Sequence, residues 1–124
     1  MTARRFLALA VLALPLLLRA DAYAAGDVAG KWTATIETQF GQQNYTYEFV
    51  VNGAQFSGKA KSNLGEAVIK DGKVTGDAVT FTEVLKFMDM EVVFEYSGTI
   101  SADEMKLTRK TGDISEPLVA KRAK

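Results

Sequence analysis

NYTYEFVVNGAQFSGKAKS, residues 44–62, is the stretch that decides the fold. Apolar and polar side chains alternate on both sides of Asn52-Gly53, which is typical of strands with one buried face. Asn-Gly favours a two-residue turn in which both residues have a positive φ, and this turn joins antiparallel strands. The stretch therefore predicts a β-hairpin with strands at residues 44–51 and 55–62.

The same alternation recurs from Lys31 onward, interrupted by further glycine-containing turn signals such as Asp71-Gly72, and no segment after Ala25 has a convincing helical period. We expect eight strands, at Lys31–Gln39, Asn44–Val51, Gln55–Ser62, Glu66–Lys70, Asp77–Val84, Phe87–Ser97, Met105–Lys110 and Pro117–Arg122. The connections are short, and a closed sheet leaves no edge strand exposed. The sequence therefore predicts an all-β fold, an antiparallel up-and-down barrel of about eight strands, with a two-sheet β-sandwich as the alternative.

The alternation also assigns side chains to the two faces of the sheet. It predicts an inner face rich in aromatic residues and methionine, and an outer face that carries the charges. Eight side chains of the predicted inner face are candidates for lining a ligand cavity: Tyr45, Tyr47, Phe49, Met88, Met90, Phe94, Tyr96 and Arg109. An eight-stranded barrel either fills with side chains or holds one small ligand. We favour a mostly filled interior. A void of at least about 300 Å³ lined by Tyr45, Tyr47, Phe94 and Tyr96 would support ligand binding, and a solid interior would exclude it.

Three of these candidates have a simpler interpretation. The flexible thioethers of Met88 and Met90 suit adaptable binding, but they fill gaps in a core equally well. Arg109 shares the inward phase of its strand with Met105 and Leu107. A buried arginine needs an anionic partner, whereas at a strand end its side chain can extend into water. We therefore favour core packing for the methionines and solvent exposure for Arg109.

The first 24 residues have the pattern of a cleavable signal peptide. Arg4 and Arg5 precede an apolar run over residues 6–18, and Ala22-Tyr23-Ala24 fits a cleavage site. The run is too short to cross a bilayer, which needs about 20 apolar residues, so an uncleaved anchor is the less favoured alternative. We expect residues 25–124 to form one domain that is exported to the periplasm or the cell exterior.

Cleavage before Ala25 would remove three basic residues and one acidic residue, leaving a net charge of −2. A weakly acidic domain with scattered charges is a poor partner for nucleic acid or anionic membranes. Cysteine is absent, so the domain must rely on packing and sheet closure in a compartment where small domains often use disulfides. We expect no nucleic-acid partner and no membrane span after cleavage.

Histidine is absent as well. The chain therefore lacks the usual general base near neutral pH, the histidine-activated nucleophiles and the commonest zinc ligand. Asp89, Glu91 and Glu95 form an acidic stripe, but they fall on the predicted outer face, whereas paired catalytic carboxylates need a cleft. The sequence predicts a protein that is not an enzyme, with no metal site and no cofactor.

The first and last predicted strands carry residues that resemble the calycin signature, namely Gly30-Lys31-Trp32 and Arg122. In that signature, a basic residue from the final strand covers the tryptophan of a G-x-W motif. Lipocalins, fatty-acid-binding proteins and avidins share this pattern. More closely, the chain is similar to small exported bacterial barrels that end in Ala-x-Arg, here Ala120-Lys121-Arg122. The resemblance implies that Trp32 plugs one barrel end under a cation–π lid from Arg122. It also implies that an inward Arg109 could meet a ligand carboxylate, as in fatty-acid carriers.

These observations lead to two functional hypotheses. The first is a non-catalytic exported barrel that binds a small apolar or amphipathic ligand in the barrel mouth. The alternative is a filled structural or interaction module of the cell envelope, with a protein partner or an inhibitory role. The volume of the interior cavity distinguishes the two.

Overall fold

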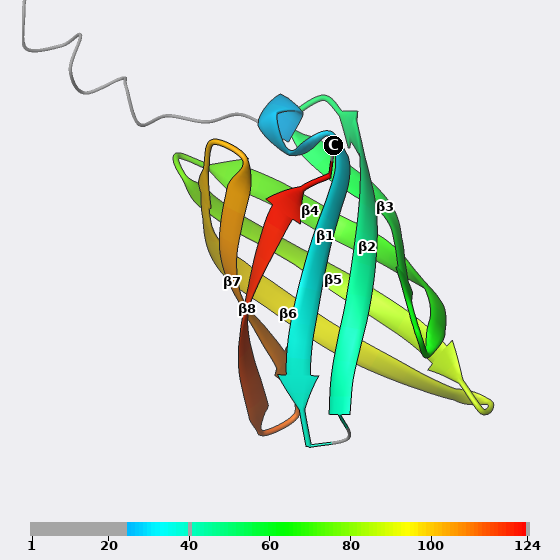
Figure 1. Ribbon diagram of the computed structural model, residues 1–124. Helices are drawn as coiled ribbons and strands as arrows, with labels where there is room; N and C mark the ends of the chain where they lie inside the picture. Colours follow the sequence, from blue (N-terminus) through cyan, green and yellow to red (C-terminus); the bar gives the residue numbers. More distant parts are fainter. Residues whose placement is uncertain (1–24, 40, 124) are drawn as a thin grey trace, which may run out of the picture.

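The computed structural model describes residues 25–39 and 41–123, which form a closed eight-stranded antiparallel barrel (Figure 1). After a short 3-10 helix, η2 (Ala25–Val28), the strands are β1 (Gly30–Thr38), β2 (Gly41–Asn52), β3 (Gln55–Ser62), β4 (Gly65–Thr75), β5 (Ala78–Phe87), β6 (Met90–Ser101), β7 (Glu104–Thr111) and β8 (Ile114–Arg122). Each strand pairs with the next, and β8 pairs with β1. The predicted up-and-down barrel is confirmed and the sandwich is not. The predicted signal peptide lies outside the described residues.

One predicted turn is instead part of a strand. Asp71-Gly72 was expected to end a strand at Lys70, but β4 continues through it to Thr75. Asp71 has a positive φ of 56°, and the β4–β5 register shifts between Lys70 and Lys73. Such a shift is a β-bulge, which bends a strand without ending it. The Asp-Gly pair therefore predicted the positive φ correctly, but the predicted reversal of the chain at this point is wrong.

The β5–β6 turn lies three residues later than the predicted strand ends imply. β5 continues to Phe87, and Met88 and Asp89 form the turn with φ values of 52° and 63°. Phe87 pairs with Met90 across it. Two positive φ values are the geometry of the tight hairpin turn that Asn-Gly usually forms, but this segment contains no glycine to mark it.

The barrel interior is packed with aromatic rings. The Tyr47 ring stacks between those of Tyr45 and Phe49, with centroid distances of 5.4 and 5.8 Å. Phe81 stacks on Tyr96 at 4.3 Å and meets Tyr47 edge-on. These contacts fill the middle of the barrel, as the short chain led us to expect.

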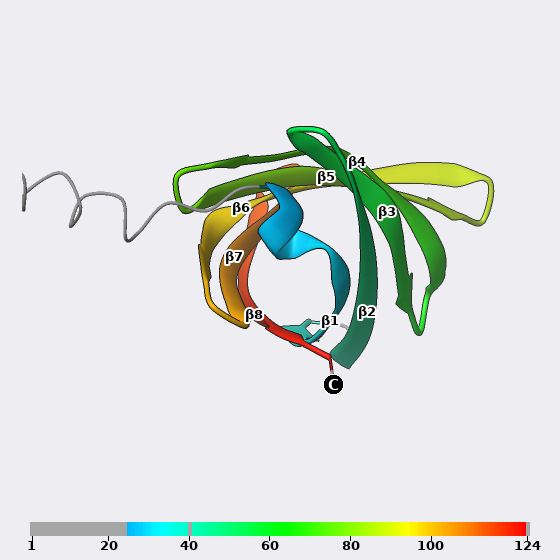
Figure 2. The ribbon, with the colours of Figure 1, turned by 90° about the horizontal axis from the view of Figure 1, so that it is seen from above.

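One end of the barrel is closed by Trp32. The ring is fully buried, and its Nε1 donates to the Val28 carbonyl oxygen at 2.9 Å. The Arg122 Cζ atom lies 4.4 Å from the ring centroid, which confirms the predicted cation–π contact. Arg122 also donates to the carbonyl oxygens of Asp27 and Ala29. Viewed from above, η2 lies over the opening that these contacts close (Figure 2).

Candidate functional site

The end of the barrel opposite η2 contains a cavity of about 410 Å³, here called the mouth cavity. It lies at the end where the β1–β2 and β7–β8 turns are found (Figure 1). Its lining consists of Glu37, Thr38, Gln39, Gln43, Leu64, Val92, Phe94, Arg109, Thr111, Ile114 and Glu116. The walls are therefore partly apolar, while one arginine and two glutamates supply charge. The volume falls within the roughly 300–1,000 Å³ that is usual for small-molecule sites.

Other hollows on the molecule have comparable volumes. One of about 410 Å³ lies along β7 and β8, and one of about 460 Å³ lies beside the β6–β7 turn. Both are more open to solvent than the mouth cavity, and neither is lined by the buried charged residues Glu83 and Arg109. Among the hollows found in the described part of the chain, the mouth cavity is the one whose lining includes a buried charged residue, Arg109.

Arg109 is the charged residue at the base of the mouth cavity, and it is only 3% exposed. β7 places it between Tyr96 of β6 and Glu116 of β8 in the register of the sheet. Its Nε and Nη2 atoms donate to Glu116 Oε1 at 3.2 and 2.6 Å, and Nη1 donates to the Tyr45 hydroxyl at 3.0 Å. The guanidinium also stacks on the Phe94 ring, 4.4 Å from its centroid. The guanidinium is therefore held on several sides.

Arg109 stays charged despite its burial. Desolvation by itself would lower the pKa of the guanidinium, but hydrogen bonding to Glu116 and the nearby tyrosine oxygens outweigh it and raise the pKa. The favoured prediction that Arg109 reaches solvent is wrong, because Glu116 supplies the anionic partner that a buried arginine needs.

A second polar group lies deeper in the barrel. The Tyr96 hydroxyl donates to Glu83 Oε1 at 2.6 Å and lies 2.9 Å from the Tyr47 hydroxyl. Since the single hydroxyl proton of Tyr96 is donated to Glu83, the Tyr47 hydroxyl must donate to Tyr96. Glu83 Oε2 is buried and has no hydrogen-bond partner among the residues that the structure describes. Burial raises the pKa of the Glu83 carboxyl above its ordinary value, with the Tyr96 hydrogen bond and Arg109 opposing the shift.

The buried tyrosines act as neutral hydrogen-bonding groups. Burial raises the pKa of Tyr45 to about 12, with a further contribution from the Glu83 charge. It raises the pKa of Tyr47 and of Tyr96 well above the ordinary value of 10.0. All three hydroxyls therefore keep their protons at neutral pH.

The structure divides the predicted ligand-lining residues into three groups. Phe94 and Arg109 line the mouth cavity. Tyr45, Tyr47, Phe49 and Tyr96 are buried in the core and are not part of the cavity lining. The predicted inward position of Met88 and Met90 is wrong, since their side chains are 80% and 63% exposed.

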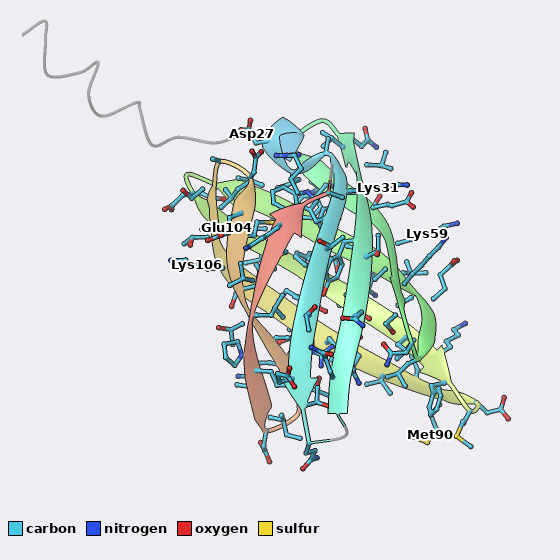
Figure 3. All side chains as sticks on the ribbon, viewed as in Figure 1. Asp27, Lys31, Lys59, Met90, Glu104 and Lys106 are labelled. Carbon is cyan, nitrogen blue, oxygen red and sulfur yellow. The ribbon has the colours of Figure 1, made fainter. Side chains whose placement is uncertain are left out.

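The prediction for the two methionines is wrong because the β5–β6 turn begins at Met88. Met88 is itself a turn residue, and Met90 starts β6 next to it. Figure 3 shows Met90 at the tip of the β5–β6 hairpin, which projects away from the ring of strands. The alternation that placed both residues inward is valid only inside the barrel, and this tip extends beyond it.

Most polar residues of the site were not among the predicted candidates, and Glu83, Gln43 and Glu116 show why. Glu83 follows Val79 and Phe81 at two-residue intervals, so alternation alone could have placed it inside. Gln43 and Glu116 lie just before the predicted starts of their strands. Their inclusion depends on strand ends, which the alternating pattern defines poorly.

The acidic stripe on β6 and its turn has no access to the interior. Asp89, Glu91 and Glu95 are all exposed, as predicted. Among residues 25–39 and 41–123, no three histidine, cysteine, aspartate or glutamate side chains gather as a metal site would require. Within that same part of the chain, no helix has the length and apolar character needed to cross a bilayer.

Comparison with known proteins does not assign the chain to a family. No family model, no curated protein and no solved structure matches it.

Proposed function

We propose that this chain is an exported, non-catalytic, calycin-like barrel that binds a small amphipathic molecule in the mouth cavity. The observation that carries the proposal is the pairing of apolar walls with a buried, hydrogen-bonded arginine at the base of a cavity of about 410 Å³. Apolar surface supplies affinity for such a ligand, and a few fixed polar groups supply orientation.

Two features at the other end support the calycin comparison. Trp32 is covered by Arg122, and β8 returns to pair with β1 beside that contact. This arrangement closes one end of the barrel and leaves access from the mouth. The absence of histidine and cysteine from the sequence supports a binding role over a catalytic one.

The site is tested by narrowing the cavity with Val92→Trp. Val92 lines the cavity, whereas its neighbour Val93 is exposed on the outer face, so Val93→Trp is a matched control. We expect isothermal titration calorimetry with 1-octanol to show binding to the native protein and to Val93→Trp, and at least tenfold weaker binding to Val92→Trp. No binding by the native protein, or equal binding by both variants, would reject the mouth cavity as the site.

A second candidate function rests on the β5–β6 hairpin tip. Phe87, Met88 and Met90 are exposed there, and an exposed apolar cluster can serve as a contact for a protein partner. Native mass spectrometry of protein purified from its own host distinguishes the candidates. A retained small-molecule mass supports the ligand carrier, whereas the mass of a stoichiometric second protein, lost in Met88→Ser, supports the envelope module.

A further inference from the structure

We infer that the mouth cavity selects amphipathic amines, that is, ligands with an apolar body and a cationic, hydrogen-bond-donating head, and disfavours carboxylates. The inference deepens the proposed function and rests on it. Its basis is the charge and hydrogen bonding of the residues that line the cavity.

The charged residues in the cavity lining are Glu37, Arg109 and Glu116. Their formal charges add to −1, because the lining contains one guanidinium and two carboxylates. Glu83 lies deeper, and its ionisation would only make the site more negative. A ligand that enters the mouth therefore meets a field that favours a cation.

Three of the five N–H donors of Arg109 are already bonded within the protein. Its Nε and Nη2 atoms are committed to Glu116, its Nη1 to Tyr45, and one face of its guanidinium to the Phe94 ring. A ligand carboxylate that bound the two remaining N–H groups would lie beside the negative charge of Glu116. A carboxylate that bound the Nε–Nη2 side would have to displace Glu116 from a 2.6 Å ion pair. That exchange would leave the half-buried Glu116 carboxylate without its partner, which is costly at such a position.

Two residues of the lining carry hydrogen-bond acceptors that no group in the described part of the chain uses. Gln43 Oε1 and Thr111 Oγ1 are both buried without a hydrogen-bond partner among residues 25–39 and 41–123, and both residues line the cavity. A buried acceptor without a donor is unfavourable, and a ligand N–H group would relieve it. A primary ammonium has three N–H donors and no acceptor, so it matches these oxygens together with the carboxylate of Glu37 or Glu116.

The test uses three probes with the same chain length and different heads: octylammonium, 1-octanol and octanoate. We expect calorimetry at pH 7 to show octylammonium binding at least tenfold more tightly than octanoate, with 1-octanol between them. Gln43→Leu should reduce the preference for octylammonium over 1-octanol by about tenfold, because it removes an acceptor from a charged donor. Glu37→Gln should weaken octylammonium binding by about threefold at low salt, and Glu91→Gln, an exposed control outside the cavity, should not.

The outcomes separate this inference from the proposed function. If 1-octanol binds and Val92→Trp prevents it, but octanoate binds as tightly as octylammonium, the charge selection is wrong and the mouth site stands. If Gln43→Leu leaves the preference unchanged, the acceptor assignment is wrong. If none of the three probes binds the native protein, both the inference and the proposed function fail.

Discussion

Glu83 is a carboxyl group enclosed by the barrel, 1% exposed, with one oxygen bonded to Tyr96 and the other unpartnered. Burial raises its pKa above 4.5, so the folded protein binds this proton more tightly than the unfolded chain does. The stability that this carboxyl contributes is therefore fully present below about pH 4.5, which is the pKa of a glutamate in the unfolded chain. It declines as the pH rises toward the raised pKa of the folded state.

Glu83→Gln should remove this pH dependence, because glutamine resembles the protonated carboxyl in size and cannot ionise. We expect the variant and the native protein to have similar free energies of unfolding near pH 4, and the variant to be the more stable one at pH 8. Urea denaturation across that pH range measures the difference. Glu95→Gln on the exposed face is the control and should show no such crossover. If Glu83→Gln were destabilising at every pH, the carboxyl would have a native role as an anion instead.

The residues of the site differ in how far the sequence can predict them. Arg109 and Phe94 were identified by alternation, since each lies well inside a strand. The partner of Arg109 could not be identified in the same way, because the contact with Glu116 depends on the register between β7 and β8. Register is set by the turn that joins the two strands and by the packing of both faces. The alternation within a single strand therefore does not predict the register between two strands.

At the scale of elements, the β5–β6 hairpin is the place where backbone conformation is least suited to the sequence. Met88 and Asp89 both have positive φ, a conformation that costs a non-glycine residue roughly 1–2 kcal/mol. Asp89→Gly should stabilise the protein by about 0.5–1 kcal/mol, since glycine adopts this conformation freely but loses more chain entropy on folding. The midpoint of urea unfolding checks the prediction.

Asp113→Gly is the matched control for the hairpin. Asp113 also lies in a tight turn, but its φ is not positive. Glycine brings no conformational relief there and adds flexibility to the unfolded chain, so we expect the control to be neutral or slightly destabilising. Equal stabilisation by both changes would mean that removing a negative charge, and not relieving the backbone, is the cause.

The two errors in the predicted turns have the same physical cause. Asp-Gly provides positive φ at low cost whether a chain turns back or only bulges, so Asp71-Gly72 gave a signal for a turn that is not there. Met88-Asp89 turns the chain without a glycine, so it gave no signal. In both cases the pairing with the neighbouring strands determines the outcome, and a two-residue motif does not specify that pairing.

At the scale of the whole molecule, closure depends on the seam between β1 and β8. Their register comprises three residue pairs, Trp32↔Arg122, Thr33↔Lys121 and Ala34↔Ala120, whereas the β5–β6 ladder runs along the whole of β5. Eight alternating segments with short connections were enough to predict a barrel. The shortness of this seam could not be predicted, and it makes the side-chain contact between Trp32 and Arg122 important for holding the ends of the sheet together.

A double-mutant cycle tests the coupling across the seam. Arg122→Ala removes the cation–π contact and the bonds to Asp103, Asp27 and Ala29, while Trp32→Leu removes the ring and keeps an apolar side chain at the barrel end. We expect each change to destabilise the protein and the pair to lose about 1–2 kcal/mol less than the sum.

The control cycle pairs Trp32→Leu with Lys121→Ala. Lys121 precedes Arg122 on β8, and its side chain is exposed. The two effects in this cycle should add within about 0.5 kcal/mol. Because the closed end and the mouth cavity share no lining residue, Arg122→Ala should lower stability while leaving 1-octanol affinity nearly unchanged. Additive effects in the first cycle would mean that the strand ladder alone closes the barrel. A large loss of affinity would mean that the two ends do not act independently.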